Sequence, residues 1–201
     1  MASSKGKKST IISAIISFFS FGYKLALGIY TSSLVLIIAS FSTLMVFICK
    51  VVFVKNITAS RASKKKAYLV MALAALIYSL IFMLFVVLKV SGIDISNKKE
   101  YEGLFGLIFI GFIFIMFILS IINLKGALEK TDIMVIGLKE MTFISALADL
   151  VIIQAFVSRI ILTYYDIPLL TKIDAFFPLG IGVLMLVIST IMITRSARYK
   201  A

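Results

Sequence analysis

The residues of this chain whose types could support chemistry inside a membrane lie in one apolar stretch, residues 141–163. Asp149 is near its middle, Gln154 follows, and Arg159 lies toward its far end. A carboxylate at bilayer depth costs roughly 3 kcal/mol or more, so such a residue is by default a functional candidate. The structural alternative is a polar contact between helices, as Asn or Gln can make. Asp149 is therefore either an ion or proton site or a helix–helix contact.

Helical geometry limits the partners of Asp149. Arg159 is about 15 Å along the helix and about 80° around it, so the two side chains cannot pair directly. Arg159 is expected to extend to the nearby interface, and Gln154 to make a packing contact. Without a nearby cation, a buried Asp149 would favour its neutral form. The sequence predicts that Asp149 faces the bundle interior and hydrogen-bonds to groups at similar depth, namely Ser40, Ser42 and Tyr78.

Other catalytic arrangements are missing from the sequence. There is no histidine, which removes the commonest general base and the zinc motifs that depend on it. No phosphate-binding glycine loop, dinucleotide fingerprint or Gly-x-Ser-x-Gly elbow is present. Asn123, Lys139 and Glu140 form only a weak polar cluster, which is better explained as a helix end. The single cysteine, Cys49, excludes an intrachain disulfide. We therefore expect no enzyme, no cofactor and no metal.

The elements that position Asp149 follow from hydropathy. Hydrophobic residues make up 62% of the 201 residues, and the mean hydropathy is +1.14. A helix needs about 20 apolar residues to cross a hydrocarbon core about 30 Å thick. The predicted fold is all-α, a polytopic bundle in one membrane domain, residues 10–201, after a disordered polar start, residues 1–9. Thr131 and Asp132 are expected to cap the helix that leads into the fourth span. The five predicted spans are 25–49, 67–88, 103–124, 141–163 and 175–194.

The N-terminal stretch from Thr10 to Tyr23 leaves two interpretations open. Its hydroxyl residues, at spacings of three and four, share one helical face: Thr10, Ser13, Ser17 and Ser20. At about 20 Å the stretch is short for a span. It is either an interfacial helix with a polar face or a packed helix whose small residues let a neighbour approach closely.

The distribution of basic residues predicts the orientation of the bundle. Lys and Arg concentrate in loops on the cytoplasmic side of membrane proteins. The loops 55–66 and 125–140 and the C-terminus are rich in them, so we expect these parts to be cytoplasmic. Five spans would then leave Lys5, Lys7, Lys8 and Lys24 on the outer side, against the rule. Either residues 9–26 cross as a sixth helix, or this segment lies flat on the membrane.

Partners follow from the same charges. The net charge of +12 does not indicate nucleic acid, because the basic residues flank spans instead of forming one soluble face. Lys64, Lys65 and Lys66 either bind anionic lipid headgroups or serve only as an orientation signal. Abundant Ile, Phe and Lys suggest a bacterial cytoplasmic membrane protein. We expect a non-catalytic subunit, scaffold or effector that forms a homo-oligomer or binds another membrane protein. The alternative is a small oligomeric channel or transporter with Asp149 on its path.

Overall fold

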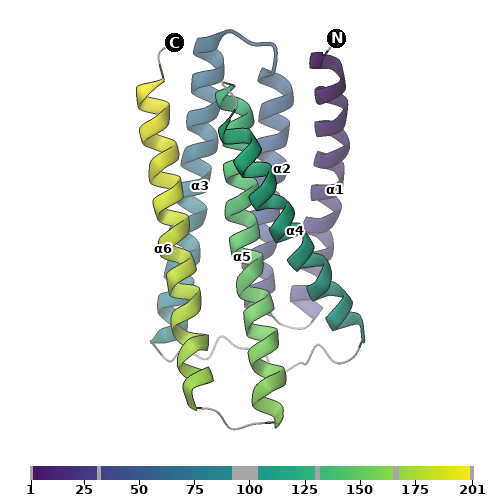
Figure 1. Ribbon diagram of the computed structural model, residues 1–201, viewed down its shortest axis with the longest axis vertical. Helices are drawn as coiled ribbons and strands as arrows, with labels where there is room; N and C mark the ends of the chain where they lie inside the picture. Colours follow the sequence, from purple (N-terminus) through teal and green to yellow (C-terminus); the bar gives the residue numbers. More distant parts are fainter. Residues whose placement is uncertain (1, 31–32, 92–103, 130–131, 165–167, 200–201) are drawn as a thin grey trace.

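Six long α-helices make up the computed structural model, which describes residues 2–30, 33–91, 104–129, 132–164 and 168–199. All six contain a segment long and apolar enough to cross a membrane, so the chain is a polytopic helical membrane protein. Successive helices alternate in direction (Figure 1). The helices are α1 (Ala2–Tyr30), α2 (Leu34–Asn56), α3 (Arg61–Val90), α4 (Leu104–Leu128), α5 (Ile133–Tyr164) and α6 (Pro168–Arg198).

The first predicted span was wrong, because the apolar run 25–49 belongs to two helices. Its beginning is the end of α1, and the rest lies in α2. Ser33 is the N-cap of α2, with extended backbone and a side chain that accepts a hydrogen bond from the Leu36 amide. Hydroxyl residues occur both at helix N-caps and at interfaces within membrane helices, so their presence alone did not reveal this boundary. Of the two alternatives for residues 9–26, α1 fits the sixth helix, since it is long and apolar enough to cross a membrane.

The predicted disordered start is also corrected. Residues 2–9 form the first turns of α1, continuous with the apolar part of the helix. No proline interrupts this segment. Once packing has nucleated the helix, each further residue that joins it gains one backbone hydrogen bond for the conformational entropy it loses. The predicted spans 67–88, 141–163 and 175–194 fall within α3, α5 and α6, and 104–124 of the span 103–124 lies in α4, while residue 103 is outside the described residues. Asp132 precedes α5 as expected, and its carboxylate accepts a hydrogen bond from the Met134 amide.

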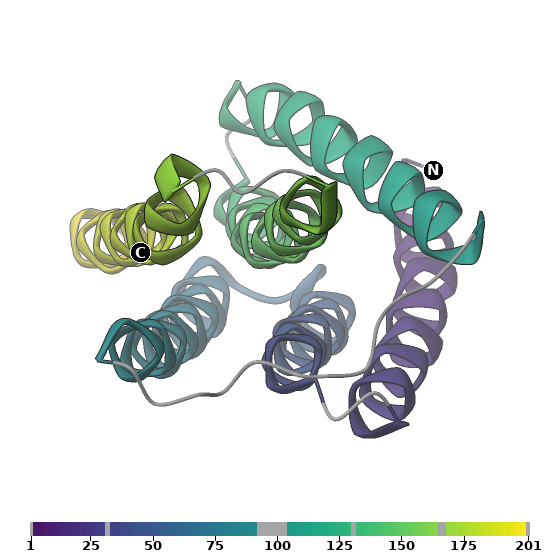
Figure 2. The ribbon, with the colours of Figure 1, turned by 90° about the horizontal axis from the view of Figure 1, so that it is seen from below.

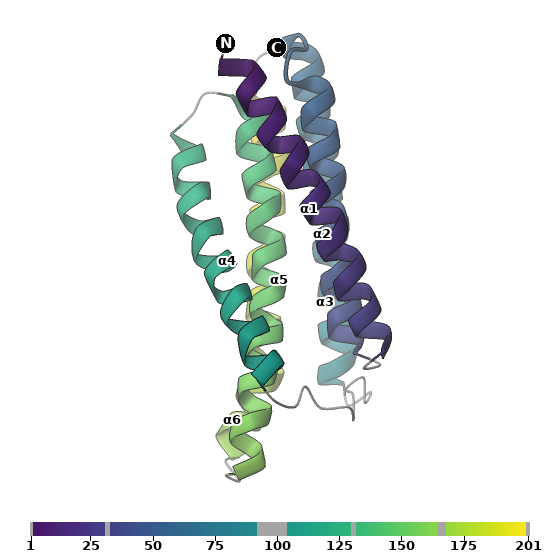
Figure 3. The same ribbon diagram turned by 90° about the vertical axis from the view of Figure 1, so that its right-hand side faces the viewer.

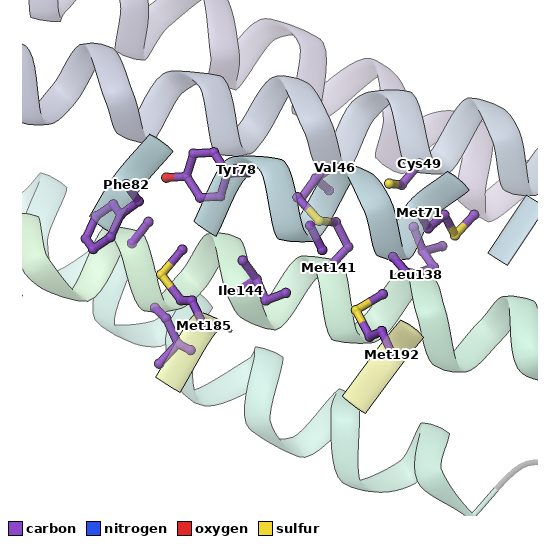
Figure 4. Packing of buried hydrophobic residues seen from close by; sticks show 14 of the residues in the cluster. Val46, Cys49, Met71, Tyr78, Phe82, Leu138, Met141, Ile144, Met185 and Met192 are labelled. Carbon is purple, nitrogen blue, oxygen red and sulfur yellow. The ribbon is translucent and has the colours of Figure 1, made fainter. Parts of the chain in front are cut away.

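The main apolar core lies between α2, α3, α5 and α6. Methionines from three of these helices meet in it, among them Met71, Met141 and Met185. Tyr78 and Phe82 on α3 extend the same core toward the other end of the bundle (Figure 4). Close packing of such side chains gives membrane helices their van der Waals attraction, because lipid tails supply no hydrophobic drive between helices.

Two helices lie outside this four-helix core. In the described residues, the backbone of α1 approaches only α2, and that of α4 approaches only α5. The view from below shows α1 beside α2 and α4 crossing over α5 (Figure 2). Figure 3 shows α1 and α4 on the same side of the molecule, with α5 visible between them. Among the described residues, α1 is therefore held mainly against α2, and α4 against α5.

Both termini lie at the same end of the bundle (Figure 1). We call this the lysine-rich end; it also holds the α2–α3 connection, residues 57–60, the end of α4 and the start of α5. The N-terminal lysines therefore share an end with loop 55–66 and with the C-terminus. An even number of crossing helices thus removes the conflict with the positive-inside rule.

Candidate functional site: a buried ion pair between the first and fifth helices

Asp149 forms an ion pair with Lys24. The Lys24 Nζ lies 2.7 Å from each carboxylate oxygen of Asp149 and also donates to the Thr43 hydroxyl at 3.2 Å. The Lys24 side chain is 7% exposed and that of Asp149 is 15% exposed. Three helices thus meet at this point: α1 supplies the cation, α2 the hydroxyl and α5 the carboxylate. Pairing of this kind is how charges are usually accommodated inside a membrane.

The polar face of α1 brings Lys24 to this position. Ser13, Ser17 and Lys24 follow at helical spacing and all turn toward α2. Lys50 on α2 donates to the carbonyl and hydroxyl oxygens of Ser13, at 3.0 and 2.8 Å, and to the Ser17 hydroxyl, at 2.6 Å. The hydroxyl face is therefore a packed interface, as in the second interpretation of this stretch. One lysine of α2 and one of α1 bind hydroxyl groups across it.

Gly28, near the end of α1, lets the two helices approach closely. The Ser33 amide donates to the Gly28 carbonyl at 2.6 Å. A Cβ added at Gly28 would lie 2.9 Å from the Ile37 side chain and 3.0 Å from its backbone nitrogen. Any larger residue would therefore push α1 away from α2 and shift Lys24 with it.

Apolar side chains close one end of the ion pair. Toward the end opposite the lysine-rich one, Leu36 and Ala39 of α2, Ile113 of α4 and Ile152 of α5 form a separate buried cluster, against which Leu27 of α1 packs. Four helices contribute to this cluster, so it joins both outer helices to the core. The apolar side chains keep water away from the ion pair on that side, and the lower dielectric strengthens the attraction between the two charges.

The predicted partners of Asp149 were wrong. Ser40 donates to the Ile37 carbonyl, and Tyr78 donates to the Ile38 carbonyl at 3.4 Å. Ser42 shares a 2.8 Å hydrogen bond with Ser145, one turn from Asp149 on α5. The prediction considered no cation near Asp149, because Lys24 was counted with the N-terminal lysines that precede the first of the five predicted spans. The spacing Ser13, Ser17, Ser20, Lys24 was the signal that Lys24 continues the polar face.

The remaining predicted site residues of α5 lie elsewhere. The Gln154 side-chain amide donates to Ser158 at 3.0 Å and to Asp174 of α6, while its Oε1 is buried without a hydrogen-bond partner. Gln154 therefore does more than fill space, since it links α5 to α6. The side chain of Arg159 lies outside the described residues.

A second ion pair on α5, which the sequence did not suggest, joins Glu140 to Arg195 of α6. Tyr68 of α3 donates to the other Glu140 oxygen at 2.9 Å. Gly137 makes room for the Tyr68 ring, since a Cβ there would lie 2.5 Å from Tyr68 Cδ2. Glu140, which hydropathy placed at a helix boundary, is in fact 5% exposed. It is buried among three helices.

A third pair lies at the lysine-rich end. The Lys64 Nζ contacts the Asp132 carboxylate at 2.8 Å, across α3 and the start of α5. Asp132, Glu140 and Asp149 therefore link the α5 segment to cations of three different helices, α3, α6 and α1. The three ion pairs fix the positions of these helices relative to α5.

No group of acidic, histidine or cysteine side chains that could hold a metal ion occurs in the described part of the chain. The chain is thus a six-helix membrane bundle whose central helix carries paired carboxylates. No protein-family model matches it, and no curated protein is significantly similar to it.

Proposed function

We propose that this protein is a non-catalytic membrane component that acts by associating with other helices in the bilayer, as a homo-oligomer or with a second membrane protein. The observation that carries the proposal is the closed pairing of charge on α5: Lys24 contacts both oxygens of Asp149, and Arg195 and Tyr68 contact Glu140. Charges engaged in this way hold helices in place, which suits a scaffold better than an active site. We place loop 55–66 and the C-terminus on the cytoplasmic side of a bacterial membrane.

The outer helices supply the surface for association in this proposal. Apolar residues at helical spacing form an outward stripe on each, and their side chains are between 44% and 70% exposed. On α1 the stripe is Ile12, Ile16 and Phe19; on α4 it is Phe112, Ile115, Leu119 and Ile122. Both helices lie on the same side of the molecule (Figure 3), so a partner could contact both.

The test is particle stoichiometry in mild detergent, measured by light scattering. We expect a homo-oligomer or a stoichiometric complex with a co-purified membrane protein. Ile115→Trp with Ile122→Trp should dissociate it. The matched control is Ile77→Trp with Leu84→Trp, on the exposed face of α3. A strictly monomeric wild-type particle without a partner would contradict the proposal.

A second candidate function is proton or cation transfer through an oligomer, with Asp149 on the path. The observation that favours it is an ion pair deep within the spans, since intramembrane charges often mark ion pathways. The measurement is flux into proteoliposomes. This candidate predicts flux above that of empty vesicles and its loss in Asp149→Asn. Unchanged flux in that variant would exclude it.

A further inference from the structure

A groove opens at the lysine-rich end, between the first turns of α3 and the last turns of α6. Its volume is about 450 Å³, in the range of sites that bind small molecules. Small side chains create it, because Ala62 faces Ser196 and Ala197 across the two helices. The rest of the floor is apolar, formed by Leu69 and Ile193. A ligand here would need an apolar part.

Two lysines border this groove. Lys65 and Lys66 both line it, mainly with the apolar parts of their side chains, so their ammonium groups are not part of its floor. Lys64, their neighbour in sequence, is turned away and pairs with Asp132. The run of three lysines is thus divided between an internal ion pair and the groove. The first turn of α3 adds the positive end of its helix dipole to the same region, so a ligand here would also need a negative group.

The position of the groove selects the kind of ligand. The lysines lie near the start of an apolar span, and the next turn presents Leu69 and Val70, which are 39% and 54% exposed. Positive charge therefore lies at headgroup level, directly beside an apolar surface at acyl-chain level. Basic pockets between membrane helices recognise lipid headgroups in this way.

We propose that this groove binds one anionic phospholipid. Its phosphate lies between the Lys65 and Lys66 ammonium groups, and the upper part of an acyl chain packs against Leu69 and Ile193. This site is independent of the proposed function, and it assigns lipid binding to two of the three consecutive lysines.

The test is native mass spectrometry of the detergent-solubilised protein incubated with phosphatidylglycerol or phosphatidylcholine. We expect one tightly retained phosphatidylglycerol and at least a fivefold preference over phosphatidylcholine. Lys65→Gln with Lys66→Gln should abolish that preference. Lys7→Gln with Lys8→Gln, which removes the same charge from exposed positions at the same end, should leave it unchanged. Ala197→Leu fills the groove without altering charge and should also release the lipid.

Three results would overturn the proposal. An equal loss of the phosphatidylglycerol preference in the Lys65–Lys66 and Lys7–Lys8 variants would mean that lipid binding depends only on the overall charge of this end. Retention of the lipid by both Ala197→Leu and the Lys65–Lys66 variant would place it elsewhere. Inorganic phosphate that competes with phosphatidylglycerol at comparable concentration would show that the lysines bind a free anion and that the groove contributes nothing. Unchanged thermal unfolding of each variant is the folding control.

Discussion

The two buried ion pairs of α5 differ in what holds them. Glu140 has two partners, Arg195 and Tyr68, from α6 and α3, which both belong to the main core. Asp149 has Lys24 as its ionic partner, and Lys24 comes from α1, whose backbone approaches only that of α2 among the described residues. The first pair therefore reinforces packing that exists without it. The second joins α5 to a helix that otherwise reaches it through side chains such as Leu27.

This difference teaches that a buried charge can serve two purposes in one helix. Where neighbouring helices are already in contact, an ion pair mainly selects their register. Where a helix lies at the periphery, the pair connects it to a helix that its backbone does not approach in the described residues.

Unpairing Glu140 should have the largest effect on stability. Arg195→Met leaves a carboxylate whose side chain is only 5% exposed, and breaking a buried pair from one side costs about 3–5 kcal/mol. The free energy of unfolding in mixed micelles measures it. Adding Glu140→Gln should recover part of the loss, whereas Arg198→Met, at an exposed position, should change little. Wild-type stability of the Arg195 variant would mean that Glu140 does not depend on this partner.

Unpairing Asp149 should cost less but should move a helix. Lys24→Met leaves a carboxylate that is 15% exposed, so we expect a loss of about 2–3 kcal/mol, toward the lower end for such pairs. The distinctive outcome is structural, because α1 loses its ionic contact with α5. Spin labels at exposed Ile16 and Val157, in a Cys49→Ala background, should show a broadened distance distribution. The Arg195→Met variant should keep the narrow one, and an equal broadening in both would remove the distinction.

Gly137 should be intolerant of a methyl group. Gly137→Ala places Cβ against the buried Tyr68 ring, and overpacking of this kind costs about 1–3 kcal/mol. Gly182→Ala is the matched control, since its nearest neighbour is the flexible Met83 sulfur at 3.3 Å. Thermal unfolding should separate the two variants. Equal loss of thermal stability in the two variants would mean that the close approach of Tyr68 to Gly137 does not contribute to stability.

The serine contacts should have the smallest effect. Ser42 bonds to Ser145 between α2 and α5, and Ser79 bonds to Ser189 between α3 and α6. Hydrogen bonds between membrane helices are worth about 0.6 kcal/mol on average, so Ser42→Ala and Ser79→Ala should each lower stability by about that amount. Losses above about 2 kcal/mol for either would show that a hydroxyl pair has a larger role than its contacts indicate.

The sequence was sufficient to predict the class of fold and most of the spans. The apolar runs of α3 to α6 are long enough to match the thickness of the bilayer, and such runs can be recognised from hydropathy alone. It did not locate the boundary between α1 and α2. Apolar residues flank that boundary on both sides, and in the sequence only Thr31, Ser32 and Ser33 interrupt them.

The partners of the buried charges were less predictable for a different reason. Lys24 and Asp149 are 125 residues apart, and their pairing depends on α1 lying against α2. Helical geometry correctly excluded a partner within α5 for Asp149, but it cannot rank residues on other helices. Glu140 and Arg195 each resemble an ordinary residue at a helix end, so their pairing is visible only once α5 and α6 are placed side by side.

The most direct test of the bridge between α1 and α5 is a double-mutant cycle on Lys24 and Asp149. Unfolding free energies of Lys24→Met, Asp149→Asn and the double variant give the coupling between the two side chains. We predict a coupling above about 1.5 kcal/mol, whereas Lys24→Met and Glu140→Gln, which share no partner, should add within about 0.5 kcal/mol. A coupling between Lys24 and Asp149 no larger than that of the control pair would contradict the account.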